Sequence, residues 1–135
     1  MMDALSMGDA DAVVVDASVL AALAFVEARA AEAADLLRDR RLFAPGLLWY
    51  EMSEVARVKS ASRPEESPAI LGQLEMARRL PIVLRSPRWA DLPQLALSTG
   101  LTAYDAAYLS LAMSLDAPLA TFDQRLKQAS DERRP

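Results

Sequence analysis

Four short, mostly apolar runs, separated by stretches with a helical pattern, constrain the fold of this chain more than any other feature. A short continuous apolar run is typical of a strand that helices cover on both faces. Strands that alternate with helices along the whole chain predict an α/β domain with a mainly parallel sheet. The four runs lie at residues 13–15, 42–44, 82–84 and 119–121.

The stretches between the runs carry apolar side chains at helical spacing. In residues 101–115, Tyr104, Tyr108 and Leu111 recur at steps of three and four, which places them on one face of a helix. Thr102 is the expected N-cap of this helix because its hydroxyl can accept a hydrogen bond from a first-turn N–H. Further helices are expected at residues 18–26, 28–40, 47–60, 70–80, 89–98 and 124–129, with a connector at residues 61–68.

The chain length indicates one domain. A chain of 135 residues, 53% of them hydrophobic, can bury a substantial core, and it shows no internal repeat or long linker. We expect a flexible N-terminal tail at residues 1–12, a folded domain at residues 13–129 and a C-terminal tail at residues 130–135.

The composition excludes several chemistries. The sequence has no cysteine, so disulfides, thiolate zinc sites and cysteine nucleophiles are excluded. It also has no histidine, which removes imidazole as a general base, a triad member and a metal ligand. Catalysis would then use carboxylates, hydroxyls, lysine, arginine or a metal ion. Oxygen ligands favour Mg²⁺ or Mn²⁺ over zinc.

The charge balance is acidic, with a net charge of −4 from 15 basic and 19 acidic residues. A protein that coats nucleic acid is usually basic, but an acidic site that binds cations leaves a nucleic-acid substrate open. No apolar run reaches the length that spans a membrane, and residues 1–12 lack the basic and apolar regions of a signal peptide. We therefore expect a cytoplasmic protein with no membrane contact.

Acidic residues stand at the places where a parallel α/β sheet binds its ligands. Asp16 directly follows the first apolar run, and Asp123 follows the last one. Because ligands of such sheets bind beyond the carboxyl ends of the strands, these two acids can converge. Asp105 lies in the first turn of the helix that leads to the last strand. Glu51 lies within an apolar stretch, where a solvated glutamate is less expected.

The three aspartates also have a purely structural interpretation, whereas Glu51 is hard to explain as a helix cap. Asp16 and Asp123 could cap the helices that follow them, and Asp105 could be a surface residue stabilised by the helix dipole. Glu54 shares a helical face with Glu51 and could be either a further ligand or a solvated residue.

A cluster of carboxylates without histidine matches few known chemistries. Crowded carboxylates raise one another's pKa, and a hard divalent cation relieves that repulsion. Such an ion lowers the pKa of a water and neutralises charge on a phosphoryl group, which suits phosphodiester hydrolysis. With only four glycines there is no glycine-rich phosphate loop. A metal-free carboxylate pair of the glycosidase type stays open, but it would not explain acids at both strand ends.

Four segments together resemble a PIN domain, and more closely the toxin ribonuclease of a VapBC-type toxin–antitoxin pair. The resemblance spans nearly the whole predicted domain, and the YDAAY box with the T-x-D-x-x-L segment after it is its most specific part. The segments are VVVDAS at residues 13–18, APGLLWYEMSEVARV at 44–58, LTAYDAAYLSLA at 101–112 and LATFDQRL at 119–126.

The resemblance implies a fold and a chemistry. The fold would be a three-layer α/β/α sandwich around a mainly parallel sheet of four or five strands. The resemblance makes Asp16, Glu51, Asp105 and Asp123 the catalytic and metal-binding acids, holding Mg²⁺ or Mn²⁺ directly or through water. A metal-activated water would then attack an RNA phosphodiester and leave a 5′-phosphate and a 3′-hydroxyl.

The resemblance also assigns supporting residues and partners. Ser18 and Thr121 match positions whose hydroxyls support the acids, while Glu54 stands where many relatives carry asparagine. The implied partners are an RNA substrate, a cognate antitoxin protein and a second copy of the chain in a homodimer. We expect RNA-phosphate contacts from basic residues near the acids, namely Arg57, Lys59 and Arg125.

Two other functions remain open at the level of sequence. One is a catalytically weak binding or scaffold module with the same fold, against which the presence of all four matched acids argues. The other is a Mg²⁺-dependent phosphatase-like or response-regulator-like acidic pocket. Such a pocket normally has a lysine near the phosphate, and neither Lys59 nor Lys127 follows a predicted strand in the expected way.

Overall fold

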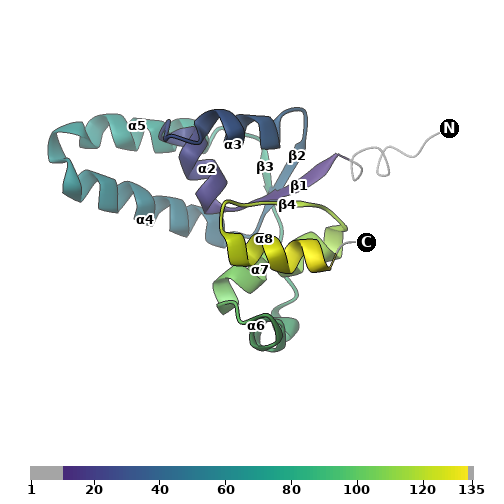
Figure 1. Cartoon of the computed structure of the whole chain (residues 1–135). Helices are drawn as coiled ribbons and strands as arrows, with labels where there is room; N and C mark the ends of the chain where they lie inside the picture. The colour runs from purple at the N-terminus through teal and green to yellow at the C-terminus, as the bar shows by residue number, and fades with distance from the viewer. Residues whose placement is uncertain (1–10, 134–135) are drawn as a thin grey trace.

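A single sheet of four parallel strands forms the centre of the protein. The computed structural model describes residues 11–133, and the strand order in it is β3-β2-β1-β4 (Figure 1). This confirms the predicted α/β class, with four strands in the sheet. Each strand falls on one of the apolar runs: β1 (Ala12–Val15), β2 (Arg41–Ala44), β3 (Ile82–Leu84) and β4 (Leu119–Ala120).

Helices cover both faces of this sheet (Figure 1). Helices α2, α3, α4 and α5 pack over one face, and α7 and α8 pack over the other, with α6 against α7. The helices are α2 (Ala17–Ala24), α3 (Ala30–Leu37), α4 (Leu47–Ser62), α5 (Ser67–Ala77), α6 (Leu92–Thr99), α7 (Ala103–Leu115) and α8 (Gln124–Glu132), with short 3₁₀ turns η1 (Pro64–Glu66) and η2 (Trp89–Asp91).

The continuous apolar run in β1 follows from this three-layer arrangement. Successive side chains of a strand point to opposite faces. Val13 and Val15 enter the core beneath α2 to α5, while Val14 enters the core beneath α7 and α8, and none of the three is more than 3% exposed. A strand buried on both faces therefore needs an apolar residue at every position.

The predicted connector at residues 61–68 is mostly helical in the structure. Helix α4 runs to Ser62, η1 follows, and α5 begins at Ser67. Pro64 and Pro68 do not break these elements because each lies in a first turn, where a backbone N–H has no helical partner. In Figure 1, α4 and α5 form a long hairpin that extends away from the sheet.

The predicted tails are also shorter than expected where the structure describes them. Ala12 already belongs to β1, and α8 continues to Glu132, beyond the helix end predicted at residue 129. Ser130 is only 4% exposed, which ties the last turn of α8 to the domain. Residues 1–10 and 134–135 lie outside the described part of the chain. Across residues 11–133, no helix has the length and apolar character needed to cross a membrane.

Replacing two of the glycines with alanine should change the stability of the protein in opposite directions. Gly100 ends α6 with φ of +74°, in the left-handed region, so we expect Gly100→Ala to cost about 1–2 kcal/mol. Gly72 lies within α5 with open space around its missing Cβ, and Gly72→Ala should stabilise the protein by about 0.5–1 kcal/mol. Urea denaturation of both variants measures the two values. Equal effects of the same sign would contradict this assignment of the α6 end.

Candidate active site

The candidate site lies at the point where the order of the strands reverses. The chain runs from β1 to β2 to β3 on one side and then returns to place β4 on the other side of β1. Open α/β sheets bind ligands outside the carboxyl ends of the strands at such a point. Asp16 follows β1 and Asp123 comes shortly after β4, so this topology brings both to the expected position.

Asp16 is a buried carboxylate, 6% exposed, with hydrogen bonds to both oxygens. Oδ1 accepts from Ser18 Oγ at 2.7 Å and from the Val19 N–H at 3.2 Å, and Oδ2 accepts from Thr121 Oγ1 at 2.5 Å. Burial raises the pKa of Asp16, and these hydrogen bonds oppose the rise. Asp16 is therefore both the N-cap of α2 and a strongly oriented acid at the edge of the sheet.

The two hydroxyls that hold Asp16 also hold the turn that carries Asp123. Thr121 Oγ1 accepts a hydrogen bond from the Asp123 N–H at 3.0 Å, and Ser18 Oγ accepts one from the Phe122 N–H at 2.9 Å. Thr121 thus contacts both the Asp16 carboxylate and the backbone of Asp123, whereas Ser18 contacts the Asp16 carboxylate and the backbone of Phe122. They join the end of β1 to the turn after β4.

Asp123 and Asp105 begin neighbouring helices. Exposed Asp123 caps α8 by accepting from the Leu126 N–H at 2.9 Å. Asp105 lies in the first turn of α7, where Thr102 Oγ1 caps the helix by accepting from the Asp105 N–H at 3.1 Å. Burial and then the charge of Asp123 raise the pKa of Asp105, while Thr102 and Arg125 lower it. The two acids therefore interact across the helix starts.

Glu51 approaches the same site from α4. It is partly buried, and its Oε1 accepts a hydrogen bond from the Tyr108 hydroxyl at 2.6 Å. Burial raises the pKa of Glu51, the Tyr108 hydrogen bond opposes the rise, and the charges of Asp105 and Asp16 add to it. Glu51 therefore joins Asp16 to Asp105 electrostatically, and the four matched acids form one interacting group.

Tyr108 is the site residue that the sequence interpretation missed. It was expected only as part of the apolar face of its helix, and it is indeed 1% exposed. Burial and the hydrogen bond to Glu51 raise the pKa of its phenol strongly, so the hydroxyl remains a donor. A buried tyrosine hydroxyl usually has a polar partner, and Tyr108 lies one turn after Asp105, which is the signal that could have identified it.

The donor chemistry of this group fits a hard divalent cation, although the arrangement is open. All four side chains offer carboxylate oxygens, which Mg²⁺ and Mn²⁺ prefer, and three of them have raised pKa values that a cation would relieve. Within residues 11–133, however, no three acidic groups lie close enough together to enclose an ion. Any cation here would use fewer direct carboxylates, with water completing its shell, or a closer approach of the side chains.

Of the other predicted residues, the structure brings one near the acids. Glu54 accepts hydrogen bonds of 2.7 and 2.8 Å from Arg57, which lower the pKa of Glu54. These two residues of α4 therefore pair with each other and not with the four acids. Lys59 forms an ion pair of 2.6 Å with Glu27. Arg125 donates from Nη2 to the Gly100 carbonyl at 2.7 Å, and its charge acts on Asp105.

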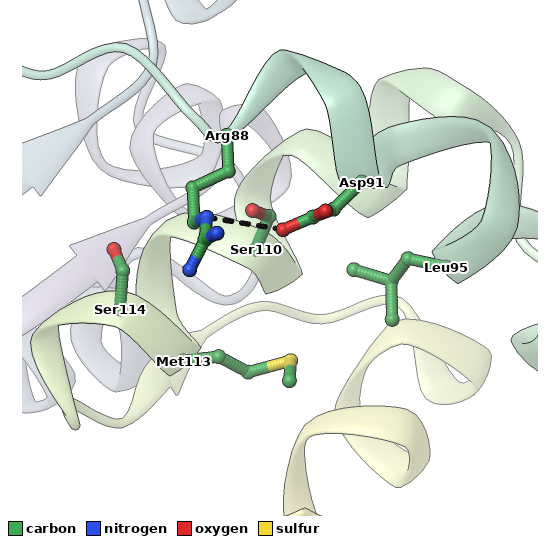
Figure 2. Close-up of a pocket in the computed structure, with 6 residues that line it drawn as sticks. All are labelled: Arg88, Asp91, Leu95, Ser110, Met113 and Ser114. Carbon is green, nitrogen blue, oxygen red and sulfur yellow. Dashed lines mark ion pairs between the residues drawn. The ribbon is translucent and has the colours of Figure 1, made fainter.

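A separate cavity of about 280 Å³ lies between the η2–α6 segment and α7 (Figure 2). Arg88 and Asp91 form an ion pair of 3.0 Å beside it, and Leu95 and Met113 contribute apolar surface. The described residues that line this cavity include none of the four acids, so we assign it no chemical role.

The sequence and the fold together identify the class of protein. The PIN domain family model matches residues 13–132, and the chain belongs to this family. Within the family the chain is VapC-like. It is 33% identical to Ribonuclease VapC3 of Pyrobaculum aerophilum over 121 residues, which cover 85% of this chain and 92% of that protein. The solved structure of PAE2754, also from Pyrobaculum aerophilum, has 26% identity and a TM-score of 0.75, covering 93% of this chain and 83% of that one.

Removing one acid should stabilise the metal-free protein at neutral pH. Raised pKa values mean that folding favours the protonated form of these carboxyls. Their contribution to the free energy of unfolding is therefore fully present below the unfolded pKa values, near pH 4. That contribution is lost as the pH rises through the higher folded pKa values. We expect Asp105→Asn to raise Tm at pH 7 in EDTA and to leave Tm almost unchanged at about pH 3.5.

The matched control for this measurement is Asp35→Asn, an exposed acid that pairs with Arg38 on the surface of α3. It should change Tm little at either pH. A lower Tm for Asp105→Asn at pH 7 would mean that its favourable place at the start of α7 outweighs the repulsion, since a first-turn acid gains about 0.3–1 kcal/mol from the helix dipole.

Proposed function

We propose that this chain is a metal-dependent endoribonuclease, the toxin component of a VapBC-type toxin–antitoxin module. The observation that carries the proposal is the group of four acids at the strand reversal: burial, and then the charges of neighbouring acids, raise the pKa of Glu51 and of Asp105. Similarity to Ribonuclease VapC3 over most of the chain supports RNA as the substrate. The residues proposed to bind Mg²⁺ or Mn²⁺ are Asp16, Glu51, Asp105 and Asp123.

A bound divalent cation would supply Lewis-acid chemistry, lowering the pKa of a water and neutralising charge on the phosphodiester. The contribution of the chain is orientation and proton transfer. Ser18 and Thr121 fix the carboxylate plane of Asp16. Tyr108 donates to Glu51 Oε1, and within residues 11–133 no hydrogen bond is made to Oε2. Glu51 would therefore act on the ion through a bound water and hold that water's proton at Oε2. The raised pKa of Glu51 suits that role.

The proposal includes partners. An antitoxin would inhibit the enzyme by inserting a segment near the acids, and the active form would be a homodimer acting in the cytoplasm, where its RNA substrate is found. Among the basic residues expected to contact RNA, Arg125 is best supported because its charge already acts on Asp105. Arg57 and Lys59 would first have to leave their ion pairs.

The phosphatase-like alternative loses support in the structure. That chemistry needs a lysine near the phosphate, and the sequence has only Lys59 and Lys127. Lys59 pairs with Glu27 and Lys127 pairs with Asp131 on α8. Neither lysine lies at the carboxyl end of a strand. The scaffold alternative is decided by the activity measurement that follows.

The direct test is cleavage of a structured RNA mixture by purified, antitoxin-free protein in Mg²⁺, Mn²⁺ or EDTA. We expect cleavage only with the metal ions, and a loss of about 100-fold or more in Asp105→Asn, the range for removing a group that acts on the reacting atoms. Asp35→Asn should cleave as the wild type does. Cleavage that persists in EDTA or in Asp105→Asn would reject the acidic centre, and no cleavage under any condition would favour the scaffold.

Tyr108→Phe tests whether the phenol positions Glu51. The change keeps the buried ring and removes the hydroxyl, so we expect the fold to persist and cleavage to fall roughly 10- to 100-fold, the size of a hydrogen bond to a charged group. The Tm increase caused by Mn²⁺ should also become smaller.

A double-mutant cycle with Glu51→Gln separates this positioning role from a general packing effect. If Tyr108 acts through Glu51, the hydroxyl should have little effect on cleavage once Glu51 is gone. Additive losses would show that Tyr108 acts elsewhere.

A further inference from the structure

An apolar pocket of about 430 Å³ lies beside the acids and takes no part in the proposed chemistry. It opens between the start of α4, the loop after β3 and the start of α7. Most of the side chains that line it are apolar or aromatic, and Ser86 adds a hydroxyl group. The central lining residues are Pro45, Leu47, Tyr50, Trp89, Leu92 and Tyr104.

The pocket and the acids share one edge of the sheet. Pro45 follows β2 and Ser86 comes shortly after β3, whereas Asp16 and Asp123 follow β1 and β4. With the order β3-β2-β1-β4 and a spacing of about 4.8 Å between strands, the pocket lies one or two strands along from Asp16. That separation is on the scale of neighbouring nucleotides.

The same two helices contribute to both places. On α4, Tyr50 lines the pocket and the next residue, Glu51, belongs to the acids. On α7, Tyr104 lines the pocket and the next residue is Asp105. The pocket and the acids are therefore neighbours along both helices.

Three aromatic rings at the pocket are unusually exposed. Tyr50 is 78% exposed, Trp89 is 70% exposed and Tyr104 is 65% exposed. Large aromatic rings contribute most to binding energy when a partner buries their surface. These three rings leave most of their surface open to a ligand. Unpaired RNA bases stack on such aromatic faces, whatever their sequence, because every base has a flat π-face.

We propose that this pocket binds an unpaired nucleobase of the RNA, next to the phosphodiester that lies at the acids. The inference rests on the proposed ribonuclease function and adds the place where a base of the substrate would be held. A base is a better occupant than a second copy of the chain because a protein seated on Tyr50 and Tyr104 would stand at the entrance to Glu51 and Asp105.

The test measures affinity for a labelled single-stranded RNA of mixed sequence by fluorescence anisotropy. The full chain carries Asp105→Asn so that the RNA stays intact, which a gel verifies. We expect Tyr50→Ala, Trp89→Ala and Tyr104→Ala each to weaken binding about 5- to 100-fold, the range for losing one stacked base. The matched control is Leu97→Ala, which removes an apolar side chain of α6 that is 78% exposed and does not line the pocket.

A second probe with one nucleotide replaced by an abasic residue identifies the ligand group. At the position that occupies the pocket, removing the base should weaken binding to the chain that carries Asp105→Asn alone. It should have little further effect when Trp89→Ala is also present, because both changes remove the same contact. Independent losses from the two changes would overturn the proposal.

Three other results would also overturn it, and they are distinguishable. If the aromatic variants bind RNA as Leu97→Ala does while the wild type still cleaves RNA, only the nucleobase site fails. If light scattering shows that Trp89→Ala converts a dimer to a monomer with RNA affinity unchanged, the pocket is an interface between copies. If the wild type neither binds nor cleaves RNA, the proposed function fails and the nucleobase site fails with it.

Discussion

The hydrogen bonds around the Asp16 carboxylate are the constraint on which the rest of the structure depends. A carboxylate this deeply buried is costly unless polar groups replace its water. The replacements come from the first turn of α2 and from Thr121, which follows β4. The two ends of the domain must therefore meet at Asp16, and the sheet, the cap of α2 and the turn that carries Asp123 are formed together.

The acids add electrostatic strain to this arrangement, and the surrounding core supports it. Val14 and Val15 bury their side chains completely on opposite faces of β1, and the two cores hold β1 between them. This rigid strand presents Asp16 to the other acids despite their mutual repulsion. Such arrangements are typical of functional sites, where perturbed carboxyls are retained at some cost in stability.

Sequence patterns predicted the parts of the site that depend on local position. Asp16 and Asp123 follow β1 and β4, as the apolar runs predicted, and each caps the next helix, while the predicted cap Thr102 begins α7. The contact between Glu51 and Tyr108 joins residues 57 positions apart, and no periodicity reports such a contact. Glu54 shares a helical face with Glu51, but spacing could not show that its carboxylate pairs with Arg57.

The same limit applies to the fold. Prolines near residue 64 suggested a loop, whereas in the structure they begin new helical turns. Proline marks a boundary in either case, and only packing determines whether a helix resumes at once. The end of α8 was missed because its last turn is polar in sequence and is held by the burial of Ser130.

The distance along the chain between Asp16 and its partner Thr121 has a consequence for biosynthesis. The two residues are separated by 105 positions, and β4 can pair with β1 only after nearly all the domain has left the ribosome. An unfinished chain lacks both the buried partner of Asp16 and the helix starts that carry Asp105 and Asp123. Under the proposed function, the enzyme acquires its ability to cut RNA only when its own translation is almost complete.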